Sequence, residues 1–422
     1  MLGLSKHIVA ALRTYKITSP FEIQERVIPK ILKGANIIAY APTGSGKSLA
    51  FLLPIIELYC RDPSPYFALI IVPARELATQ IYKFIHDFGS SSGIKSVEII
   101  GGQNYVTQKS AFLNYPNIIV ATPGRLSLLL KEHSITRHFF MLQFFVLDEF
   151  DCLFNDNIYK DVAEIIKIVP QKAQIIMFSA TDVNLKPITA HFPLTKFEVV
   201  DIRKPLLILK HYKLLVNSIV PQYHLINFLL NSDKHGFGEP STGIIFCLDI
   251  KSTELMSRTL RMLKHKVTCI NSLQSQRMRT HSLNSFICGE NRVLIATDLV
   301  ARGIDIPTVD WVINIQLPYD DKNYIHRSGR CVRAGKEGVS LQIIFKNNSL
   351  KYKHAKARLA NIEQKYKILF EPFKIDFDEI FTTPKAVLHS LTASSVELEK
   401  NNFTEKLAHK RTNRKKEHSL RT

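Results

Sequence analysis

Short apolar runs rich in β-branched residues alternate with stretches of helical periodicity along most of this 422-residue chain. This alternation is typical of parallel α/β units, in which each strand is followed by a helix that packs back on the sheet. Nearly every expected strand runs directly into Gly, Thr, Asp or Arg. Because ligands bind at the carboxyl ends of parallel strands, we expect the chemistry to collect there. The expected strands are Ile37–Tyr40, Phe67–Val72, Val97–Ile100, Ile118–Ala121, Phe144–Leu147, Ile175–Phe178, Gly243–Cys247, Val267–Ile270, Arg292–Ala296, Trp311–Ile315 and Val339–Phe345.

The alternation breaks around Asp201–Tyr212, which includes Pro205 and is the candidate linker. It separates two α/β halves, residues 1–205 and 206–370, each large enough to bury a core of its own. From about residue 350 the strands are expected to stop, and residues 371–422 are expected to form a polar extension with a basic end.

A glycine-rich segment, Ala41-Pro42-Thr43-Gly44-Ser45-Gly46-Lys47-Ser48, joins the first expected strand to an apolar helix from Leu49. Backbone N–H groups of such a loop cradle phosphates at the helix N-terminus. In this P-loop pattern Lys47 would reach the β- and γ-phosphates, and Ser48 would ligate Mg²⁺. Ala41 stands where the pattern has Gly, so a purely structural turn remains the alternative.

An acidic segment, Asp148-Glu149-Phe150-Asp151, ends the expected strand Phe144–Leu147. A carboxylate at the end of a strand in the same sheet as a P-loop is the expected holder of Mg²⁺. Glu149 would position or deprotonate the attacking water. An acidic turn that caps the following helix is the alternative. Together the two segments predict a nucleoside triphosphatase.

The composition excludes several classes of protein. Hydrophobic residues make up 45% and charged residues 22%, which is ordinary for a folded globular chain. No apolar run approaches the roughly 18–20 residues of a membrane span. The opening residues 1–7 lack the apolar core of a secretion signal. The six cysteines are scattered without a C-x-x-C pair, which indicates a reducing compartment and no zinc site.

Basic residues outnumber acidic ones, 56 Lys and Arg against 37 Asp and Glu, which gives a formal charge of +19. Residues 206–370 carry +12 of this excess, residues 1–205 carry +5, and residues 371–422 carry +2. An excess of this kind indicates an anionic partner, although a solvated surface accounts for part of any such charge.

Further short segments accompany the two phosphate-site segments in a fixed order, and together they resemble the DEAD-box RNA helicases of superfamily 2. The likeness covers nearly the whole chain and implies two tandem RecA-like domains, each a parallel sheet flanked by helices. The matching segments are Pro20–Gln24, Pro73–Ala78, Gly101-Gly102, Thr122–Arg125, Asp148–Asp151, Ser179–Thr181, Gln276–Arg279, Thr297-Asp298, Ala301–Asp305 and His326–Arg333.

The resemblance implies an RNA-dependent ATPase with ATP and Mg²⁺ as cofactors, and it assigns roles in the nucleotide site. Gln24 would bind the adenine edge, Asp305 the ribose, and Ser48 and Asp148 the metal. Glu149 would activate water, and Arg330 and Arg333 would act as arginine fingers. His326 would orient water, with a merely packed histidine as the alternative. The expected nucleotide contacts are Gln24, Ala41, Thr43, Gly44, Ser45, Gly46, Lys47, Ser48, Gly303 and Asp305.

The resemblance also implies RNA contacts from both halves of the chain. These would reach phosphates and 2′-hydroxyls, so sequence preference should be slight. Asp151, Ser179 and Thr181 would link the acidic turn to the RNA site, with a simple strand-end turn as the alternative for Ser179 and Thr181. The expected RNA-binding residues are Arg75, Gly102, Thr122, Arg125, Arg279 and Thr297.

Three of the departures from the family pattern lie in segments of the nucleotide site. Phe150 stands in place of Ala between the carboxylates and leaves all three carboxylates in place. Phe21 and Lys16 stand where the adenine-binding segment usually has Thr and Gly. From these two positions we expect looser adenine selectivity.

Within the family, the chain resembles the nucleolar helicases of small-subunit ribosome assembly. The resemblance rests on Leu2–Ser5, on Ile306–Val309, and on Asn402-Phe403 followed by a Lys/Arg cluster at 410–416. It implies a monomer in the nucleus and nucleolus that acts on pre-rRNA, with pre-ribosomal proteins as further partners. The basic cluster itself either tethers RNA, serves as a nuclear address, or is a solvated end.

Two other functions use the same two-lobed engine. An ATP-gated clamp would hold RNA as a scaffold with little turnover, and a DNA translocase would be stimulated by DNA. The presence of every residue that hydrolysis needs favours the helicase. Glu149→Gln separates enzyme from clamp, and matched RNA and DNA separate helicase from translocase.

Overall fold

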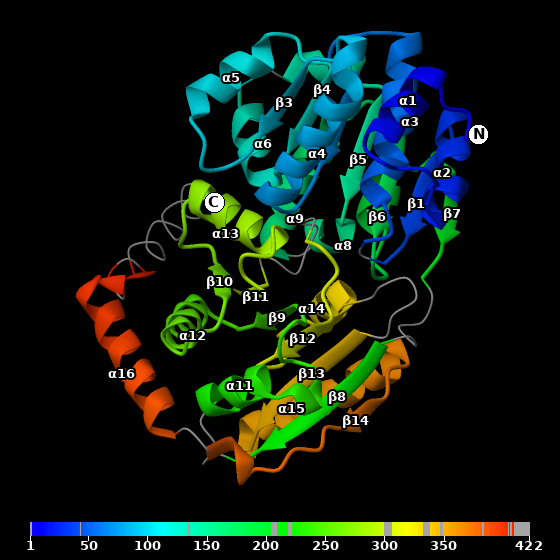
Figure 1. Ribbon diagram of the computed structural model, residues 1–422. Helices are drawn as coiled ribbons and strands as arrows, with labels where there is room; N and C mark the ends of the chain where they lie inside the picture. The colour runs from blue at the N-terminus through cyan, green and yellow to red at the C-terminus, as the bar shows by residue number, and fades with distance from the viewer. Residues whose placement is uncertain are drawn as a thin grey trace. The chain divides into compact units, whose positions relative to one another are not determined.

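The computed structural model describes residues 2–42, 44–132, 136–154, 156–203, 209–217, 222–298, 306–331, 338–346, 349–381, 384–403, 405, 407 and 408. These residues form two compact units (Figure 1): unit 1 within Met1–Lys204, and unit 2 within Pro205–Arg302 and Ile306–Thr422. Each unit contains a seven-stranded sheet flanked by helices, as expected. Among the helices that the structure describes, none is long and apolar enough to cross a membrane.

The sheet of unit 1 has the strand order β3-β4-β2-β5-β6-β1-β7, and every described pairing in it is parallel. The sequence predicts all of these strands except β7, an edge strand whose only buried residue is Val200. Such an exposed strand shows little of the apolar pattern by which strands are recognised. The strands are β1 Asn36–Tyr40, β2 Ala68–Ile71, β3 Ser96–Ile99, β4 Ile118–Ala121, β5 Phe144–Asp148, β6 Gln174–Ser179 and β7 Phe197–Asp201.

Helices cover both faces of this sheet because neighbouring residues of each strand point to opposite sides. In β1, Ile37 and Ala39 pack in one core with α2, α3 and α4, whereas Ile38 and Tyr40 pack in a second core with α6 and α9. The helices of unit 1 are α1 Lys6–Thr14, α2 Glu22–Leu32, α3 Lys47–Arg61, α4 Arg75–Gly89, α5 Tyr105–Leu113, α6 Pro123–Leu130, α8 Phe150–Leu153, α9 Asp156–Lys167 and α10 Lys186–His191, with the 3₁₀ turns η1 Ser90–Ser92 and η2 Arg137–Met141.

The sheet of unit 2 has the order β10-β11-β9-β12-β13-β8-β14, again with parallel pairings throughout its described strands. Its helices are α11 Gln222–Asn231, α12 Ile250–Met262, α13 Gln276–Ile287, α14 Asp321–Ser328, α15 Ser349–Tyr366 and α16 Pro384–Lys400, with the 3₁₀ turns η3 Asp233–His235, η4 Gly329–Cys331 and η5 Glu379–Phe381. Its strands are β8 Leu209–Val216, β9 Gly243–Phe246, β10 Val267–Ile270, β11 Val293–Ala296, β12 Trp311–Asn314, β13 Gly338–Phe345 and β14 Phe370–Pro372.

Strands β8 and β14 correct two expectations. The candidate linker was drawn too long, because Asp201 still belongs to β7 and Leu209 already begins β8. Lysines interrupt the apolar pattern of β8, while the polar His211 occupies a buried position at 4% exposure. The strands also continue past residue 350, since β14 pairs with β8.

Much of the segment expected to form a polar extension packs on unit 2. Phe373 and Ile375 follow β14 and pack against the hydrophobic core of unit 2. Val387 and Leu398 of α16 are also buried, at 1% and 4% exposure, and the Arg258 guanidinium of α12 is paired with Glu397. The basic cluster at 410–416 lies outside the described residues.

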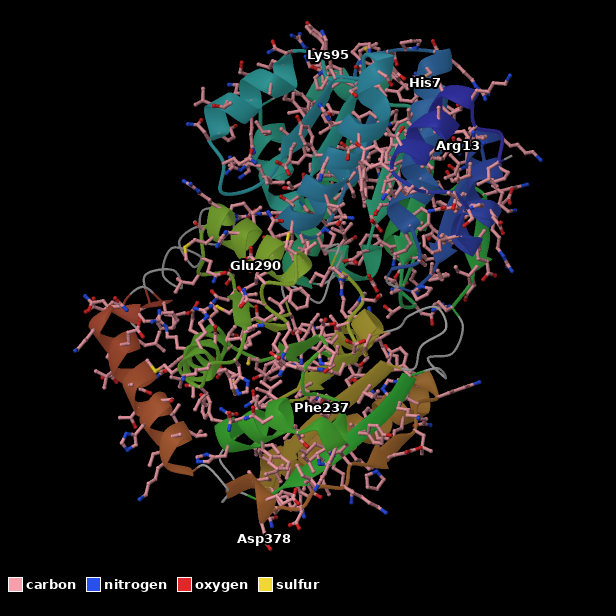
Figure 2. All side chains as sticks on the ribbon, in the orientation of Figure 1. His7, Arg13, Lys95, Phe237, Glu290 and Asp378 are labelled. Atoms are coloured by element: carbon pink, nitrogen blue, oxygen red, sulfur yellow. The ribbon has the colours of Figure 1, made fainter. Side chains whose placement is uncertain are left out.

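The single tryptophan lies in the core, as its apolar strand predicts. Trp311 is 1% exposed, its Nε1 donates a hydrogen bond to Ser241 Oγ at 3.0 Å, and its ring centroid lies 5.4 Å from that of Phe237, which Figure 2 labels. A Cβ atom at Gly243 would come within 2.1 Å of the indole. Trp311 therefore organises packing and offers no exposed surface for stacking on a base.

Candidate active site

The strand order of unit 1 divides the carboxyl edge of its sheet into two halves. The neighbouring strands β5, β6 and β1 lead into the acidic turn, the Ser179–Thr181 turn and the P-loop. The neighbouring strands β3, β4 and β2 lead into Gly101-Gly102, Thr122 and Arg75. The expected ATP contacts and the expected RNA contacts of this unit therefore occupy adjacent halves of one edge.

The P-loop turns sharply from β1 into α3. Gly44 and Gly46 have φ values of 74° and 84°, in the left-handed region that favours glycine. Lys47 begins α3, is only 8% exposed, and donates from Nζ to the carbonyl of Ala41 at 3.1 Å. Ser45 Oγ closes the loop by donating to the Pro42 carbonyl at 2.8 Å. Thr43 lies outside the described residues.

The acidic turn holds two carboxyl groups almost completely out of water. Asp148 and Glu149 are each 2% exposed. Burial raises the pKa of Asp148 to about 7, and the nearby charge of Lys47 opposes part of this rise. Glu149 adopts the left-handed conformation, with φ 50° and ψ 48°, and its backbone N–H donates to Asp148 Oδ1 at 2.9 Å. Its Oε2 is buried and accepts no hydrogen bond from the described residues.

This donor set fits a hydrated divalent cation. A buried carboxyl with a raised pKa and a buried carboxylate oxygen without a partner both gain from a positive charge or a bound water. Asp148 and the half-buried Ser48 provide the hard oxygen ligands that Mg²⁺ prefers.

The Ser179–Thr181 turn joins the acidic turn to the P-loop. Thr181 Oγ1 donates to Asp151 Oδ2 at 2.6 Å, and Ser179 Oγ donates to the Thr181 carbonyl at 2.6 Å. The backbone N–H of Ala41 donates to the Ser179 carbonyl at 2.9 Å. All four residues are buried. These contacts bring together the three residues expected to couple the sites.

Gln24 lies against the P-loop rather than in the open. It is 3% exposed, its Nε2 donates to the Gly46 carbonyl at 3.1 Å, and its Oε1 accepts from the Phe21 N–H at 3.0 Å. A Cβ at Gly46 would come within 2.5 Å of Gln24 and 2.7 Å of the Phe21 ring. Gln24 therefore packs directly against the loop that would hold the phosphates.

Arg75 explains why two glycines stand at the end of β3. Its guanidinium lies so close to Gly101 and Gly102 that a Cβ on either would come within 2.6 Å of it. Gly102 also has φ +91°, a conformation that side chains rarely adopt. The two glycines thus let the Arg75 guanidinium lie directly on the backbone.

Arg125 and Thr122 lie on the same half of the edge. Arg125 Nη2 donates to the Gln103 carbonyl at 3.2 Å, directly after the two glycines, and its guanidinium carbon lies 5.9 Å from the centroid of the Tyr105 ring. Thr122 precedes α6 and its N–H donates to the Ile99 carbonyl at 3.0 Å. The structure therefore gathers the four RNA contacts expected from unit 1.

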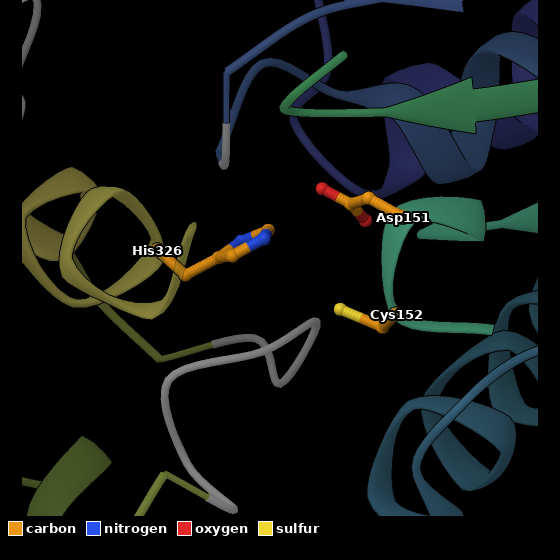
Figure 3. A group of neighbouring side chains, drawn as sticks. All are labelled: Asp151, Cys152 and His326. Atoms are coloured by element: carbon orange, nitrogen blue, oxygen red, sulfur yellow. The ribbon is translucent and has the colours of Figure 1, made fainter. Parts of the chain in front are cut away.

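In unit 2 the expected residues also follow strand ends. Arg279 lies on α13 after β10, and Thr297 directly follows the neighbouring β11. His326 of α14 is fully buried, and Arg330 of η4 is 7% exposed. Figure 3 labels His326 on its helix, α14. Gly303, Asp305 and Arg333 lie outside the described residues.

The sequence reasoning assigned no role to Arg327, which is fully buried. Its Nε donates to Asp298 Oδ1 at 2.6 Å, and its Nη1 donates to Asn314 Oδ1 at 3.0 Å. Asn323 Nδ2 donates to the other oxygen of Asp298 at 3.0 Å. Asp298 thus fixes α14, and with it His326, relative to Thr297. Asp298 directly follows Thr297, an expected RNA contact, and this position in the sequence could have indicated that Asp298 has a role.

Comparison with known proteins decides the family. The model of the DEAD/DEAH box helicase family matches residues 21–186, and that of the helicase conserved C-terminal domain matches residues 224–335. The ATP-dependent RNA helicase DBP8 of Scheffersomyces stipitis is 34% identical over 98% of this chain and 94% of that protein. The chain belongs to the DEAD-box family of ATP-dependent RNA helicases. DBP8 of Kluyveromyces lactis, 37% identical over 81% of this chain and 80% of that protein, is a further relative.

A solved structure agrees in fold with this DEAD-box helicase. Dbp5 of S. cerevisiae bound to RNA and ADP BeF3 has a TM-score of 0.73, with 26% identity over 92% of this chain and 98% of that chain. The two units are accordingly the tandem RecA-like domains of the family, and the chain is an enzyme that binds ATP and RNA. The relatives are DEAD-box helicases of the DBP8 type.

Proposed function

We propose that this helicase hydrolyses ATP in an RNA-stimulated reaction and uses it to open short duplexes in pre-rRNA during small-subunit biogenesis. One observation supports the coupling of ATP hydrolysis to RNA binding. The ATP half and the RNA half adjoin on one sheet edge, and the buried hydrogen bond from Thr181 to Asp151 ties the Ser179–Thr181 turn to the acidic turn. A shift that RNA binding imposes on this edge would therefore reach the carboxylates.

In the nucleotide half, Gly44, Gly46 and Lys47 hold the phosphates, while Ser48 and Asp148 hold Mg²⁺. The metal, when bound, neutralises charge that develops on the phosphoryl oxygens. Glu149 orients and deprotonates the attacking water, since its Oε2 is buried without a partner among the described residues. Gln24 binds the adenine edge next to the loop that it already contacts.

Residues of unit 2 complete the chemistry. Arg330 and Arg333 act as arginine fingers, Asp305 contacts the ribose, and His326 orients water. Fingers of this type contribute about 10³–10⁵ in rate. Because these groups and Lys47 belong to different units, hydrolysis depends on both units.

The RNA half binds the backbone rather than the bases. Arg75 and Arg125 carry the charge, Gly102 and Thr122 allow close approach, and Arg279 and Thr297 extend the contact to unit 2. Phosphate and 2′-hydroxyl contacts give affinity for RNA with little preference for sequence.

The finer assignment to pre-rRNA, a nucleolar location and action as a monomer among pre-ribosomal proteins rests on the resemblance of Leu2–Ser5, Ile306–Val309 and Asn402-Phe403 to the nucleolar helicases of small-subunit assembly. Crosslinking the protein to RNA in cells tests it, and enrichment of pre-rRNA over messenger RNA is the expected result. Crosslinks spread evenly over cellular RNA would contradict this assignment while leaving the helicase activity intact.

The enzymatic assignment is tested by ATP hydrolysis with matched nucleic acids. RNA should stimulate hydrolysis well above DNA of the same sequence, and equal stimulation would contradict RNA specificity. Glu149→Gln should lower the turnover number by about 10²–10⁴-fold, because a positioned base contributes that much. Binding of ATP and RNA by this variant is the control that its site remains folded.

A further inference from the structure

Arg203 and three aromatic side chains of unit 1 lie in a row beside the nucleotide site. The guanidinium carbon of Arg203 lies 4.4 Å from the centroid of the Tyr40 ring. The Tyr40 ring lies 6.1 Å from the ring of Phe150, which in turn lies 5.9 Å from Phe154. Tyr40 is the last residue of β1 before the P-loop, and Phe150 directly follows Glu149. The row therefore touches both phosphate-site segments.

Two carboxylates hold Arg203 in place. Its Nη1 donates to Asp182 Oδ1 at 2.8 Å, and its Nε and Nη2 donate to the two oxygens of Asp201 at 3.0 and 2.5 Å. Asp182 directly follows the Ser179–Thr181 turn. These ion pairs raise the pKa of Arg203 further above its usual value. A planar guanidinium fixed by two partners is well oriented to stack on a ring.

Phe150 is one of the positions at which this chain departs from the family pattern, and its ring packs within this row. The ring is fully buried between Tyr40 and Phe154. It anchors a turn whose preceding residue, Glu149, has φ 50°. A left-handed conformation at a residue other than glycine persists only where its surroundings hold it. Phe150 directly follows Glu149, and its buried ring is therefore one of the groups that hold this conformation.

We propose that Arg203 is a positioning residue for ATP hydrolysis, which acts through Tyr40 and Phe150 on the backbone that carries Glu149. This inference rests on the proposed role of Glu149. Arg203 has no part in nucleotide contact, because its guanidinium is engaged by Asp182, Asp201 and the Tyr40 ring. It is also the last described residue of unit 1. The row thus begins where the chain leaves that unit.

A double-mutant cycle tests the proposal. Arg203→Met should lower the turnover number for ATP at saturating RNA by about 3–30-fold, which corresponds to the usual strength of a cation–π contact. The KM for ATP should change much less. In a Phe150→Ala background, Arg203→Met should have little further effect, because the row is already broken. Arg61→Met is the matched control, since Arg61 is another ion-paired arginine of unit 1, bound to Glu57 at 3.0 Å.

Variants of Tyr40 test the middle of the row. Tyr40→Phe keeps the ring and should retain most of the turnover number, whereas Tyr40→Leu should reproduce the effect of Arg203→Met. Arg203→Lys keeps the charge but cannot form the same paired contacts, and it should lie between the wild type and Arg203→Met. Because Arg203→Lys is the mildest change, it keeps the test valid if Arg203→Met fails to fold.

A structural role alone would give a different result. If Arg203 only secures the sheet edge, its variants would lower the melting temperature and leave the turnover number unchanged. Either that result or additive effects of Arg203→Met and Phe150→Ala would overturn the proposal. A wild-type protein whose hydrolysis is not stimulated by RNA would instead contradict the proposed function. The cycle on the basal hydrolysis rate would then still test the positioning role.

Discussion

Asp148 shows what the burial of a carboxyl group costs in the interior of unit 1. Its carboxyl is 2% exposed and shares its surroundings with Glu149 and Asp151, so its ionised form is disfavoured there. Lys47 compensates part of this cost. The pKa of about 7 in the folded protein, against 3.8 as its ordinary value, means that folding favours the protonated form.

This raised pKa predicts a pH dependence of stability in the nucleotide-free protein. The stabilising contribution is fully present below about pH 4 and is lost as the pH rises through about 7, because the ionised carboxylate is then buried. Asp148→Asn should remove this loss, which is on the order of 2–4 kcal/mol. Urea unfolding between pH 5 and 8 measures it. The exposed Asp62→Asn is the control, and identical pH profiles for wild type and Asp148→Asn would contradict the prediction.

Gly102 makes a second prediction at the residue scale. Gly102→Ala should weaken RNA binding about tenfold or more, because the new Cβ would displace the Arg75 guanidinium and strain a backbone with φ +91°. Fluorescence anisotropy with a short single-stranded RNA measures the loss. Gly93→Ala is the matched control, since Gly93 has φ +71° but open space around its Cβ position. Equal losses in the two variants would assign the effect to backbone strain alone.

At the scale of elements, the two helices before the P-loop differ in the residue that adopts a left-handed backbone conformation after each helix. Helix α1 ends at Thr14, and the chain then turns through Lys16, whose φ of 58° is costly for any residue with a Cβ. Helix α2 is followed by Gly34, which has φ +84° without that cost. Lys16 stands where the family pattern has glycine, and the structure shows the conformational reason for that preference.

Lys16→Gly should therefore stabilise unit 1. The relief of the left-handed backbone exceeds the added freedom of the unfolded chain, for a net gain of about 0.5–1 kcal/mol and a rise of about 1–3 °C in melting temperature. Lys33→Gly is the matched control, because Lys33 follows α2 with an ordinary φ of −88°. It should lower the melting temperature. A fall for Lys16→Gly as well would show that the Lys16 side chain contributes more than its backbone costs.

Which elements were predictable depends on how much each strand is buried. Strand β5 is buried throughout and β1 is buried at all but its first residue, so both stand out as apolar runs, and the acidic turn and the P-loop are predicted on the right elements. Strand β8 is not predicted because a histidine, His211, fills a buried position 2.7 Å from the Tyr324 hydroxyl, where burial lowers the pKa of His211 to about 4. The contact of Arg203 with Tyr40 joins residues far apart in sequence, and no local spacing indicates such a pair.

At the scale of the whole molecule, the charge of the chain is divided among different tasks. The charge predicted an anionic partner, and the family identifies that partner as RNA. Two of these positive charges have defined places in unit 1. The Arg75 guanidinium lies against a glycine backbone, and the Arg125 guanidinium lies beside a tyrosine ring. Residues 409–422 contribute a further basic segment that the described residues do not include.

Removal of residues 409–422 should weaken RNA binding and flatten its salt dependence. For every RNA phosphate that this segment neutralises, its removal should reduce the slope of log affinity against log salt by about 0.7 for single-stranded RNA. The basal ATPase rate should stay close to that of the full chain. Truncation after Ala408 retains Phe403, which is 7% exposed, so the folded part of the C-terminal segment is kept. An unchanged slope would show that this segment does not touch RNA.

The contact between Lys47 and the Ala41 carbonyl determines what an arriving nucleotide has to displace. The ammonium group is already dehydrated and held by its own loop, so the phosphates exchange one protein acceptor for another instead of stripping water from a free charge. When the product leaves, the Lys47 ammonium group can again donate its hydrogen bond to the Ala41 carbonyl. Nucleotide affinity therefore measures the difference between two arrangements in each of which the Lys47 ammonium group has an acceptor.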